Sequence, residues 1–258
     1  NITGALTSGD YTDDTSLVLS GTNEAGSVVI VYNGTTELGY ATVSGTSWTY
    51  TASVANGTTY QFNVKETDLA SNTSDATSNF TVTGDTTTPS VTLNAGNLNA
   101  SDSAVVQSTE NGTVYLIRES VDVSNLASIT GAADNLWNSV TISAPSTNTS
   151  LPVTGLINGT YEAYAVDYAG NLSSESSNSV IIDSTIPTIT NVVISSASGK
   201  QNNLLNAGDN VSVTVTFSES VLIASGTPTL TLVVGSINQT AIYDAEDNGT
   251  NQMVFQYT

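Results

Sequence analysis

Short segments in which hydrophobic and polar residues alternate recur along the chain. Residues 60–65 (YQFNVK) and 211–217 (VSVTVTF) keep a period of two. This period places one set of side chains on a buried face and the other in water, as in a β-strand. Asn-Gly, Ser-Gly and Gly-Thr pairs, which favour turns, separate further segments of this kind. The other predicted strands are residues 27–34, 47–52, 113–120, 139–142, 228–234 and 253–258.

The strand pattern predicts an all-β fold of immunoglobulin-like β-sandwiches in a linear array. One stretch departs from the period of two: residues 122–138 fit either a short helix or an Ω-loop. Tyr60 and Tyr161 each follow an Asn-Gly-Thr turn at the start of a predicted strand. Each fits a tyrosine corner, in which the hydroxyl bonds to the upstream backbone, or a half-buried tyrosine at a strand end.

Three sequence features repeat in the same order and predict the domain boundaries. The form D-x-T-x-P occurs at residues 85–89 and 183–187, and an Asp-containing loop precedes it at 68–72 (DLASN) and 167–171 (DYAGN). An acid at a strand start also precedes a glutamate three times, as Asp14/Glu24, Asp102/Glu110 and Asp209/Glu219. We therefore expect domains at residues 1–86, 87–184 and 185–258. The last is short for a sandwich and is expected to lack its final strands.

Composition and charge exclude several classes of function. The 258 residues include 3 basic and 23 acidic ones, for a formal net charge of −20, and contain no histidine and no cysteine. Imidazole or thiolate catalysis and zinc or haem sites with His or Cys ligands cannot be built. The charge would repel nucleic acid. No segment is apolar enough for a membrane span, and a secretion signal is expected outside this sequence.

The repeated acids predict calcium sites at the domain junctions. Ca²⁺ prefers six to eight hard oxygen ligands, chiefly carboxylates, and carboxylates that converge without a cation repel one another. We expect a loop acid and a linker acid to face the strand-start acid and the glutamate of the next domain. The first expected set is Asp68, Asp85, Asp102 and Glu110; the second is Asp167, Asp183, Asp209 and Glu219.

Asp14 and Glu24 are expected to form half of a further site, completed by an upstream domain. The alternative for all these acids is that they add solubilising charge, or that they bond to backbone amides at turns without a metal.

The D-x-T-x-P linkers, the DYAGN loop and the FSESV…GTPTLTL pattern of residues 217–232 resemble tandem bacterial immunoglobulin-like repeats. Such repeats form the stalks of giant biofilm-associated adhesins of the RTX type, which leave Gram-negative cells by type I secretion. The resemblance covers the whole chain and implies sandwiches in single file, with calcium stiffening their junctions. The DLASN loop at residues 68–72 departs from this DYAGN pattern.

Two functions follow from these observations. The first is a calcium-rigidified extender of a secreted bacterial cell-surface adhesin, a monomer whose partners are the neighbouring domains of its own chain. The alternative is a sugar- or peptide-binding module centred on the second domain, where Trp137 lies in the 122–138 insertion near Tyr164 and Tyr168. Packing in the core or at a sheet edge is the plainer explanation of Trp137 and Trp48. We expect no enzyme, because a glycosidase's paired carboxylates have no reason to recur in each repeat.

Overall fold

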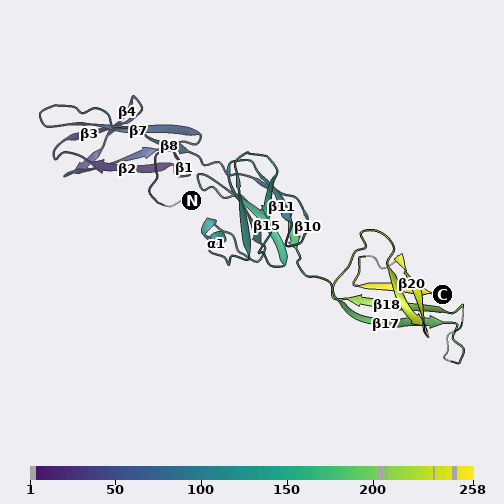
Figure 1. Ribbon diagram of the computed structural model, residues 1–258. Helices are drawn as coiled ribbons and strands as arrows, with labels where there is room; N and C mark the ends of the chain where they lie inside the picture. The colour runs from purple at the N-terminus through teal and green to yellow at the C-terminus, as the bar shows by residue number, and fades with distance from the viewer. Residues whose placement is uncertain (1–3, 203–205, 207, 235, 246–248) are drawn as a thin grey trace. The chain divides into compact units, whose positions relative to one another are not determined.

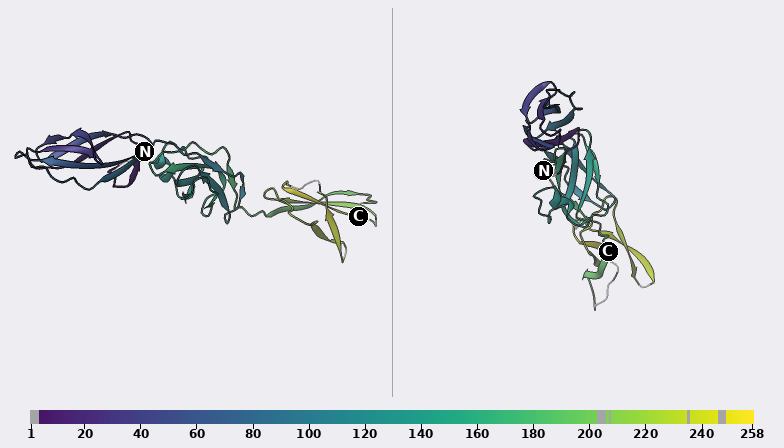
Figure 2. Two further views of the ribbon diagram at one scale, coloured as in Figure 1. Left: turned by 90° about the horizontal axis from the view of Figure 1, so that it is seen from above. Right: turned by 90° about the vertical axis from the view of Figure 1, so that its left-hand side faces the viewer.

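The computed structural model describes residues 4–202, 206, 208–234, 236–245 and 249–258. The chain divides into two compact units, Asn1–Ser184 and Thr185–Thr258. The first unit contains two β-sandwiches in succession, which we call the first sandwich (β1–β8) and the second sandwich (β9–β16) (Figures 1 and 2). Residues 185–258 are called the C-terminal unit. The all-β fold predicted from the alternating pattern is confirmed.

The first sandwich packs a five-stranded sheet, in the order β1-β8-β7-β3-β4, against a three-stranded sheet, β2-β6-β5. β1 runs parallel to β8, and the other pairs are antiparallel. Val29 and Val31 of β3 and Trp48 of β6 form its buried core, so Trp48 is a packing residue. The strands are β1 (Asp10–Thr12), β2 (Ser16–Thr22), β3 (Val28–Asn33), β4 (Thr36–Tyr40), β5 (Thr42–Ser44), β6 (Ser47–Ser53), β7 (Thr58–Thr67) and β8 (Phe80–Gly84).

The second sandwich repeats this arrangement, with sheets β10-β16-β15-β12-β13 and β14-β11-β9. β10 runs parallel to β16, as β1 does to β8. Side chains from both sheets, including Val106, Leu116, Tyr161 and Ile182, form one buried core. The strands are β9 (Val91–Leu93), β10 (Gly96–Leu98), β11 (Ser103–Ser108), β12 (Gly112–Arg118), β13 (Trp137–Ile142), β14 (Thr149–Pro152), β15 (Gly159–Asp167) and β16 (Val180–Ile182).

The insertion at 122–138 contains a short helix, α1 (Leu126–Thr130). The Asn125 side chain accepts a hydrogen bond from the N–H of Ser128 (3.0 Å), and the N–H of Asn125 donates to the Ser128 hydroxyl (3.2 Å). This reciprocal capping satisfies two backbone donors at the start of the helix. Ile129 is fully buried and anchors the insertion. The helical alternative for this stretch is therefore the correct one.

Of the two alternatives for Tyr161, the tyrosine corner is the correct one. Its ring is fully buried in the core, and its hydroxyl donates to the carbonyl of Ile157 (2.8 Å), four residues upstream. Tyr60 occupies the matching place in the first sandwich, where its hydroxyl accepts from the N–H of Ala55 (3.0 Å). Both tyrosines therefore fix the turn that leads into their strand.

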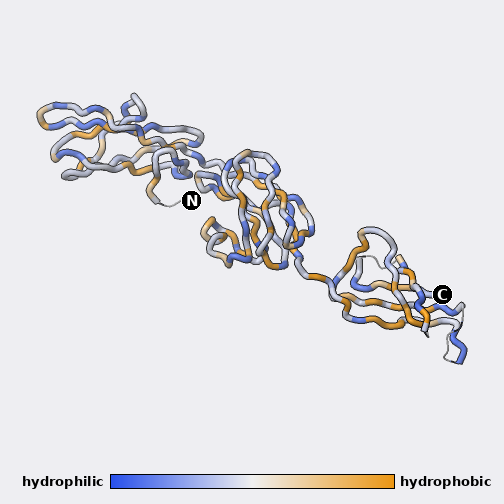
Figure 3. Tube along the Cα trace, in the orientation of Figure 1, coloured by the Kyte–Doolittle hydropathy of each residue, from blue (hydrophilic) through white to orange (hydrophobic). Residues whose placement is uncertain are grey.

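The described residues of the C-terminal unit form a five-stranded sheet in the order β17-β18-β21-β20-β19. Val215, Tyr243 and Phe255 belong to its buried cluster. Hydrophobic residues also lie on the surface of β17, where Val192 and Ile194 are exposed (Figure 3). The strands are β17 (Ile189–Ser198), β18 (Asn210–Phe217), β19 (Thr229–Val234), β20 (Ile237–Tyr243) and β21 (Gln252–Tyr257). Within the described parts of the chain, no helix has the length and apolar character of a membrane span.

Tyr161→Phe should lower the free energy of unfolding of the second sandwich by about 1 kcal/mol, because the carbonyl of Ile157 loses its donor while the ring stays in place. Urea unfolding followed by circular dichroism measures this change. Tyr40→Phe is the control, since Tyr40 lies on the exposed edge strand β4 and is 68% exposed. Equal stability of Tyr161→Phe and the unmodified protein would contradict a stabilising corner.

Candidate metal centre

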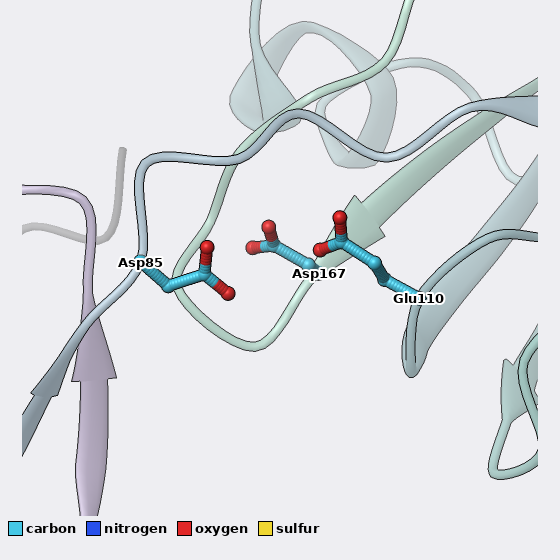
Figure 4. Close-up of side chains that lie close together, drawn as sticks. All are labelled: Asp85, Glu110 and Asp167. Atoms are coloured by element: carbon cyan, nitrogen blue, oxygen red, sulfur yellow. The ribbon is translucent and has the colours of Figure 1, made fainter. Parts of the chain in front are cut away.

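Three carboxylates from distant parts of the chain meet where the first sandwich joins the second. Asp85 follows β8, Glu110 lies between β11 and β12, and Asp167 ends β15. A carboxylate oxygen of each lies within 4.8 Å of the other two. The three side chains point toward one another, with Asp167 at the tip of its strand (Figure 4). Asp167 is 7% exposed and the other two are half-buried, so the cluster is partly shielded from water.

Backbone contacts hold Asp85 at the start of the linker. Its N–H donates to the carbonyl of Thr12 (2.8 Å), which continues the parallel pairing of β1 with β8. Its Oδ1 accepts from the N–H of Thr87 (3.0 Å). The next residue, Thr86, donates its N–H to Oδ1 of Asn56 (2.9 Å). The linker is thereby fastened to the Asn-Gly-Thr turn before β7.

The same fastening recurs at the second linker. The N–H of Asp183 donates to the carbonyl of Leu98 (2.9 Å), and the N–H of Ser184 donates to Oδ1 of Asn158 (2.9 Å). Nδ2 of Asn158 also donates to Oδ1 of Asp183 (2.8 Å). The repeated Asn-Gly-Thr turns therefore have a structural role in addition to starting a strand: their asparagines hold the linkers.

The DYAGN loop orients Asp167. Asn171 donates its N–H to Oδ1 of Asp167 (2.9 Å) and its side-chain Nδ2 to Oδ2 (2.7 Å). The same Nδ2 donates to the backbone carbonyl of Asp85 (2.9 Å). Asn171 thus fixes the orientation of one carboxylate and ties the loop of the second sandwich to the linker of the first.

The DLASN loop has the same conformation despite its different sequence. Asn72 donates its N–H to Oδ1 of Asp68 (2.8 Å) and its Nδ2 to Oδ2 (2.8 Å), as Asn171 does to Asp167. Ser71 has φ of 69° where Gly170 has φ of 92°, so both loops use a left-handed residue that costs more without glycine. The hydrogen bonds from Asn72 hold the pKa of Asp68 below its ordinary value. The loop frame that orients the aspartate is therefore kept where the sequence departs from the pattern.

The pKa of Glu110 reflects the closeness of the other two carboxylates in the cluster. Glu110 precedes Gly112, where a Cβ would lie 2.1 Å from the carbonyl oxygen of Val166, so glycine lets β12 approach the Asp167 loop. Burial, followed by the negative charges of Asp85 and Asp167, raises the pKa of Glu110 above its ordinary value. Its carboxylate is therefore destabilised in the fold, and a cation would reverse that effect.

A cavity of about 300 Å³ lies at the cluster. Tyr11 of the first sandwich and Tyr168 of the second stand on its wall, with ring centroids 6.3 Å apart. The cavity provides room for an ion with part of its hydration shell. Its lining residues are Tyr11, Asp85, Thr87, Thr109, Glu110, Asn111, Pro145, Asp167 and Tyr168.

The structure groups the acids differently from the sequence prediction. Asp85 and Glu110 meet as expected, but Asp167 joins them in place of Asp68 and Asp102. Placing Asp167 with Asp183 was wrong, because Gly159 at the start of β15 pairs with Ile182, whereas Asp167 lies at the other end of that strand. Eight residues of extended chain separate those ends by roughly 25 Å.

Each strand-start acid is also separated from its glutamate by the length of a strand. Asp102 precedes β11 and Glu110 follows it, so the two lie at opposite ends of the second sandwich. Asp102 instead accepts from the N–H of Asn99 (2.9 Å), and Asp209 accepts from the N–H of Asn206 (2.6 Å). Turn chemistry, the alternative considered from the sequence, accounts for the carboxylates of both aspartates.

Asp14 and Glu24 also lie apart, at the two ends of β2. Asp14 lies near the linker, because the carbonyl of neighbouring Thr12 accepts the hydrogen bond from the N–H of Asp85. Glu24 lies near the DLASN loop, where its N–H donates to the carboxylate of Glu66 (2.5 Å). In the C-terminal unit, the N–H of Ser218 donates to the carbonyl of Thr188 (2.8 Å). This bond puts Glu219 at the Thr188 end and Asp209 at the other end of β18. Among the described residues, Oε1 of Glu219 is buried without a hydrogen-bond partner.

Trp137, Tyr115 and Tyr164 are neighbours on one sheet of the second sandwich, whereas Tyr168 lies elsewhere. Trp137 is half-buried and packs against Tyr115, with ring centroids 5.8 Å apart. Tyr164 pairs with Tyr115 across the sheet and donates its hydroxyl to Glu175 (3.2 Å). Tyr168 instead lies at the carboxylate cluster beside Tyr11. Trp137 therefore packs against the sheet as expected, and the predicted group of Trp137, Tyr164 and Tyr168 is not formed, because Tyr168 is elsewhere.

A comparison with protein families agrees with the fold of the first sandwich. Residues 1–86 match the family of bacterial Ig-like domains. A comparison with curated proteins gave no match. The second sandwich repeats the strand order of the matched segment, including its parallel pair. The first unit thus consists of Ig-like β-sandwich domains.

Among solved structures, the fibronectin(III)-like modules of Clostridium thermocellum CbhA are 14% identical, with a TM-score of 0.40, over 69% of this chain and 90% of theirs. SGBP-B of the Bacteroides ovatus mixed-linkage glucan utilization locus, solved with a mixed-linkage heptasaccharide, is 12% identical, with a TM-score of 0.23 over 98% of this chain. Sidekick-1 immunoglobulin domains 1–4 are 11% identical, with a TM-score of 0.25 over 99% of this chain. The chain spans 57% and 64% of the last two, respectively.

Without divalent ions, Glu110→Gln should raise the melting temperature at neutral pH, because it removes a carboxylate whose pKa is raised in the folded state. A raised pKa means that the folded state binds more protons, so stability falls as pH rises above about 4.3, the ordinary value for glutamate. The gain should disappear below that pH. Melts across pH in a chelator measure it, with Glu37→Gln on the exposed strand β4 as control. A pH-independent gain would contradict this assignment.

Proposed function

We propose that the chain is a calcium-stabilised extender segment of a secreted bacterial cell-surface adhesin, with a Ca²⁺ site at Asp85, Glu110 and Asp167. The observation that carries this proposal is the convergence of three carboxylates from two successive sandwiches. Asp85 comes from the linker after the first sandwich, and Glu110 and Asp167 come from the second sandwich. An ion bound by all three therefore connects the two sandwiches. Exposed acids that only add solubility have no reason to point toward one another.

The donor set fits a hard cation. Three carboxylates offer up to six oxygens, and the chain has no histidine or cysteine to supply softer ligands. Ca²⁺ takes six to eight oxygens, whereas Mg²⁺ needs a stricter octahedron and keeps more of its water. The half-buried cavity leaves room for water to complete the coordination. These features favour Ca²⁺.

Electrostatics explains how calcium would stiffen the junction. Two like charges 4 Å apart cost about 4 kcal/mol at an effective dielectric of 20, and here three carboxylates repel one another. That repulsion pushes the linker of the first sandwich away from the loop of the second. A divalent ion bound between the carboxylates would attract all three and so hold the linker to the loop. The hydrogen bond from Asn171 to the carbonyl of Asp85 also holds the linker to the loop.

The surface location and the extender role rest on chemistry and resemblance together. Extracellular modules bind calcium in the 10⁻⁴–10⁻³ M range, a concentration found outside cells and not in the cytosol. Residues 1–86 match bacterial Ig-like domains, and the D-x-T-x-P linkers resemble those between the stalk repeats of biofilm-associated adhesins of the RTX type. Adhesins of this type leave the cell by type I secretion. Repeated sandwiches with clamped linkers suit a spacer that holds an adhesive region away from the cell.

Ca²⁺ at about 100 times its Kd should stabilise the first unit by about 2.7 kcal/mol. Calorimetric melts with calcium or with a chelator measure this, and isothermal titration gives the Kd. Glu110→Gln and Asp85→Asn should abolish the calcium-dependent rise. Asp183→Asn is the matched control, because Asp183 is a linker aspartate at the other end of the second sandwich. Equal melts of the unmodified protein with and without calcium would overturn the proposal, and so would an undiminished rise in Glu110→Gln.

A further inference from the structure

A polar pocket on the first sandwich lies away from the carboxylate cluster. Its volume is about 430 Å³, and it opens on the outer face of β3 and β7. On these strands Val31 and Val64 belong to the packed core of the sandwich, whereas Tyr32 and Asn63 are paired across the opposite face. The pocket is lined by amide side chains, one aromatic ring and one ammonium group. This inference is independent of the calcium proposal.

The floor of the pocket contains a buried amide with a free acceptor. Asn63 is only 6% exposed. Its Nδ2 donates to the carbonyl of Gly34 (2.9 Å) and to Oδ1 of Asn79 (3.1 Å), which fixes the orientation of the amide. Within the described residues, no hydrogen bond reaches Oδ1 of Asn63. Because Asn63 lines the pocket, this oxygen can accept a hydrogen bond from a group placed there.

The neighbouring amides extend the same network toward the pocket. Nδ2 of Asn79 donates to Oε1 of Gln61 (3.0 Å). An amide nitrogen carries two hydrogens, so Asn79 keeps one donor and Gln61 keeps both donors of its Nε2. Gln61 is exposed at the rim. The pocket therefore presents fixed donors beside a fixed acceptor.

The aromatic ring and the ammonium group complete the lining. Nζ of Lys65 lies 5.7 Å from the ring centroid of Tyr32. Lys65 is the one basic residue of the sequence before Arg118, and the cation–π contact places it in the pocket. Tyr32 is half-buried, so part of its ring remains accessible to a ligand.

We propose that this pocket binds one pyranose unit of a neutral saccharide. A pyranose hydroxyl donates and accepts at once, which matches the Asn63 acceptor beside the Gln61, Asn79 and Lys65 donors. Its C–H face can pack on the ring of Tyr32. The volume holds a single sugar ring, and the net charge of −20 disfavours a polyanion.

The second sandwich has a cleft with different chemistry at the matching place. Ser176 donates its N–H to the carbonyl of Ala163, as Thr77 does to Val64, so the clefts border equivalent strands, β15 and β7. Glu162, Tyr164 and Glu175 line the cleft of the second sandwich. The cleft of the second sandwich therefore has carboxylates where the pocket of the first has amides. It serves as an internal control, because we expect the saccharide to bind at the first sandwich alone.

The experiment titrates the full 258-residue chain, labelled with ¹⁵N, with glucose, galactose, mannose and N-acetylglucosamine in turn. We expect saturable shifts of the Gln61, Asn63 and Asn79 side-chain amides with at least one sugar, at a Kd on the order of 1 mM. Tyr32→Ala and Gln61→Ala should weaken binding about tenfold. Tyr40→Ala on the exposed strand β4 should leave the Kd unchanged. Gln61 is exposed, so its removal leaves the core intact.

No shift with any of the four sugars, at up to about fifty times that Kd, would overturn the proposal. Shifts confined to the cleft of the second sandwich would overturn it as well. The same follows if Gln61→Ala and Tyr40→Ala bind equally well. These outcomes leave the calcium proposal untouched, since the same chain can be titrated in a chelator.

Discussion

Mutual repulsion among Asp85, Glu110 and Asp167 is the constraint on which the joint between the two sandwiches depends. Hydrogen bonds from Thr87 and Asn171 hold the carboxylates of Asp85 and Asp167. Gly112 lets β12, which Glu110 precedes, approach the loop of Asp167. The fold therefore maintains a concentration of negative charge that a cation can relieve.

The two sandwiches show how one framework supports different surface chemistry. Loop and linker clamp recur with closely similar hydrogen bonds, as the pairs Asp68/Asp167 and Asn56/Asn158 illustrate. The tyrosine position recurs too, although the Tyr60 hydroxyl accepts a bond and the Tyr161 hydroxyl donates one. The outer faces differ, since amides line one and carboxylates the other. Backbone bonds preserve the frame, so the side chains that face solvent are free to diverge.

Strands such as β7 and β18 were predictable because their hydrophobic and polar residues alternate, whereas β17 is exposed along nearly its whole length and was not predicted. The position of Tyr161 after an Asn-Gly-Thr turn allowed a tyrosine corner, but only the structure distinguishes it from a half-buried tyrosine. The residue types of the site were predictable, since the acids recur. Their grouping was not. Asp102 and Glu110 belong to one repeated motif, yet a strand between them carries them to opposite ends. Asn171 was visible as the last residue of the DYAGN loop, but only the three-dimensional contact reveals its bond to Asp85.

The parallel pairing of β1 with β8 has a mechanical consequence for the first sandwich. The chain enters this sandwich by β1 and leaves it by β8. Tension applied through the chain pulls two parallel neighbours lengthwise in opposite directions. The hydrogen bonds between them are then loaded together in shear and cannot be opened one by one like a zipper. The resistance of the first sandwich to stretching is therefore set by β1 and β8, whatever its remaining strands contain.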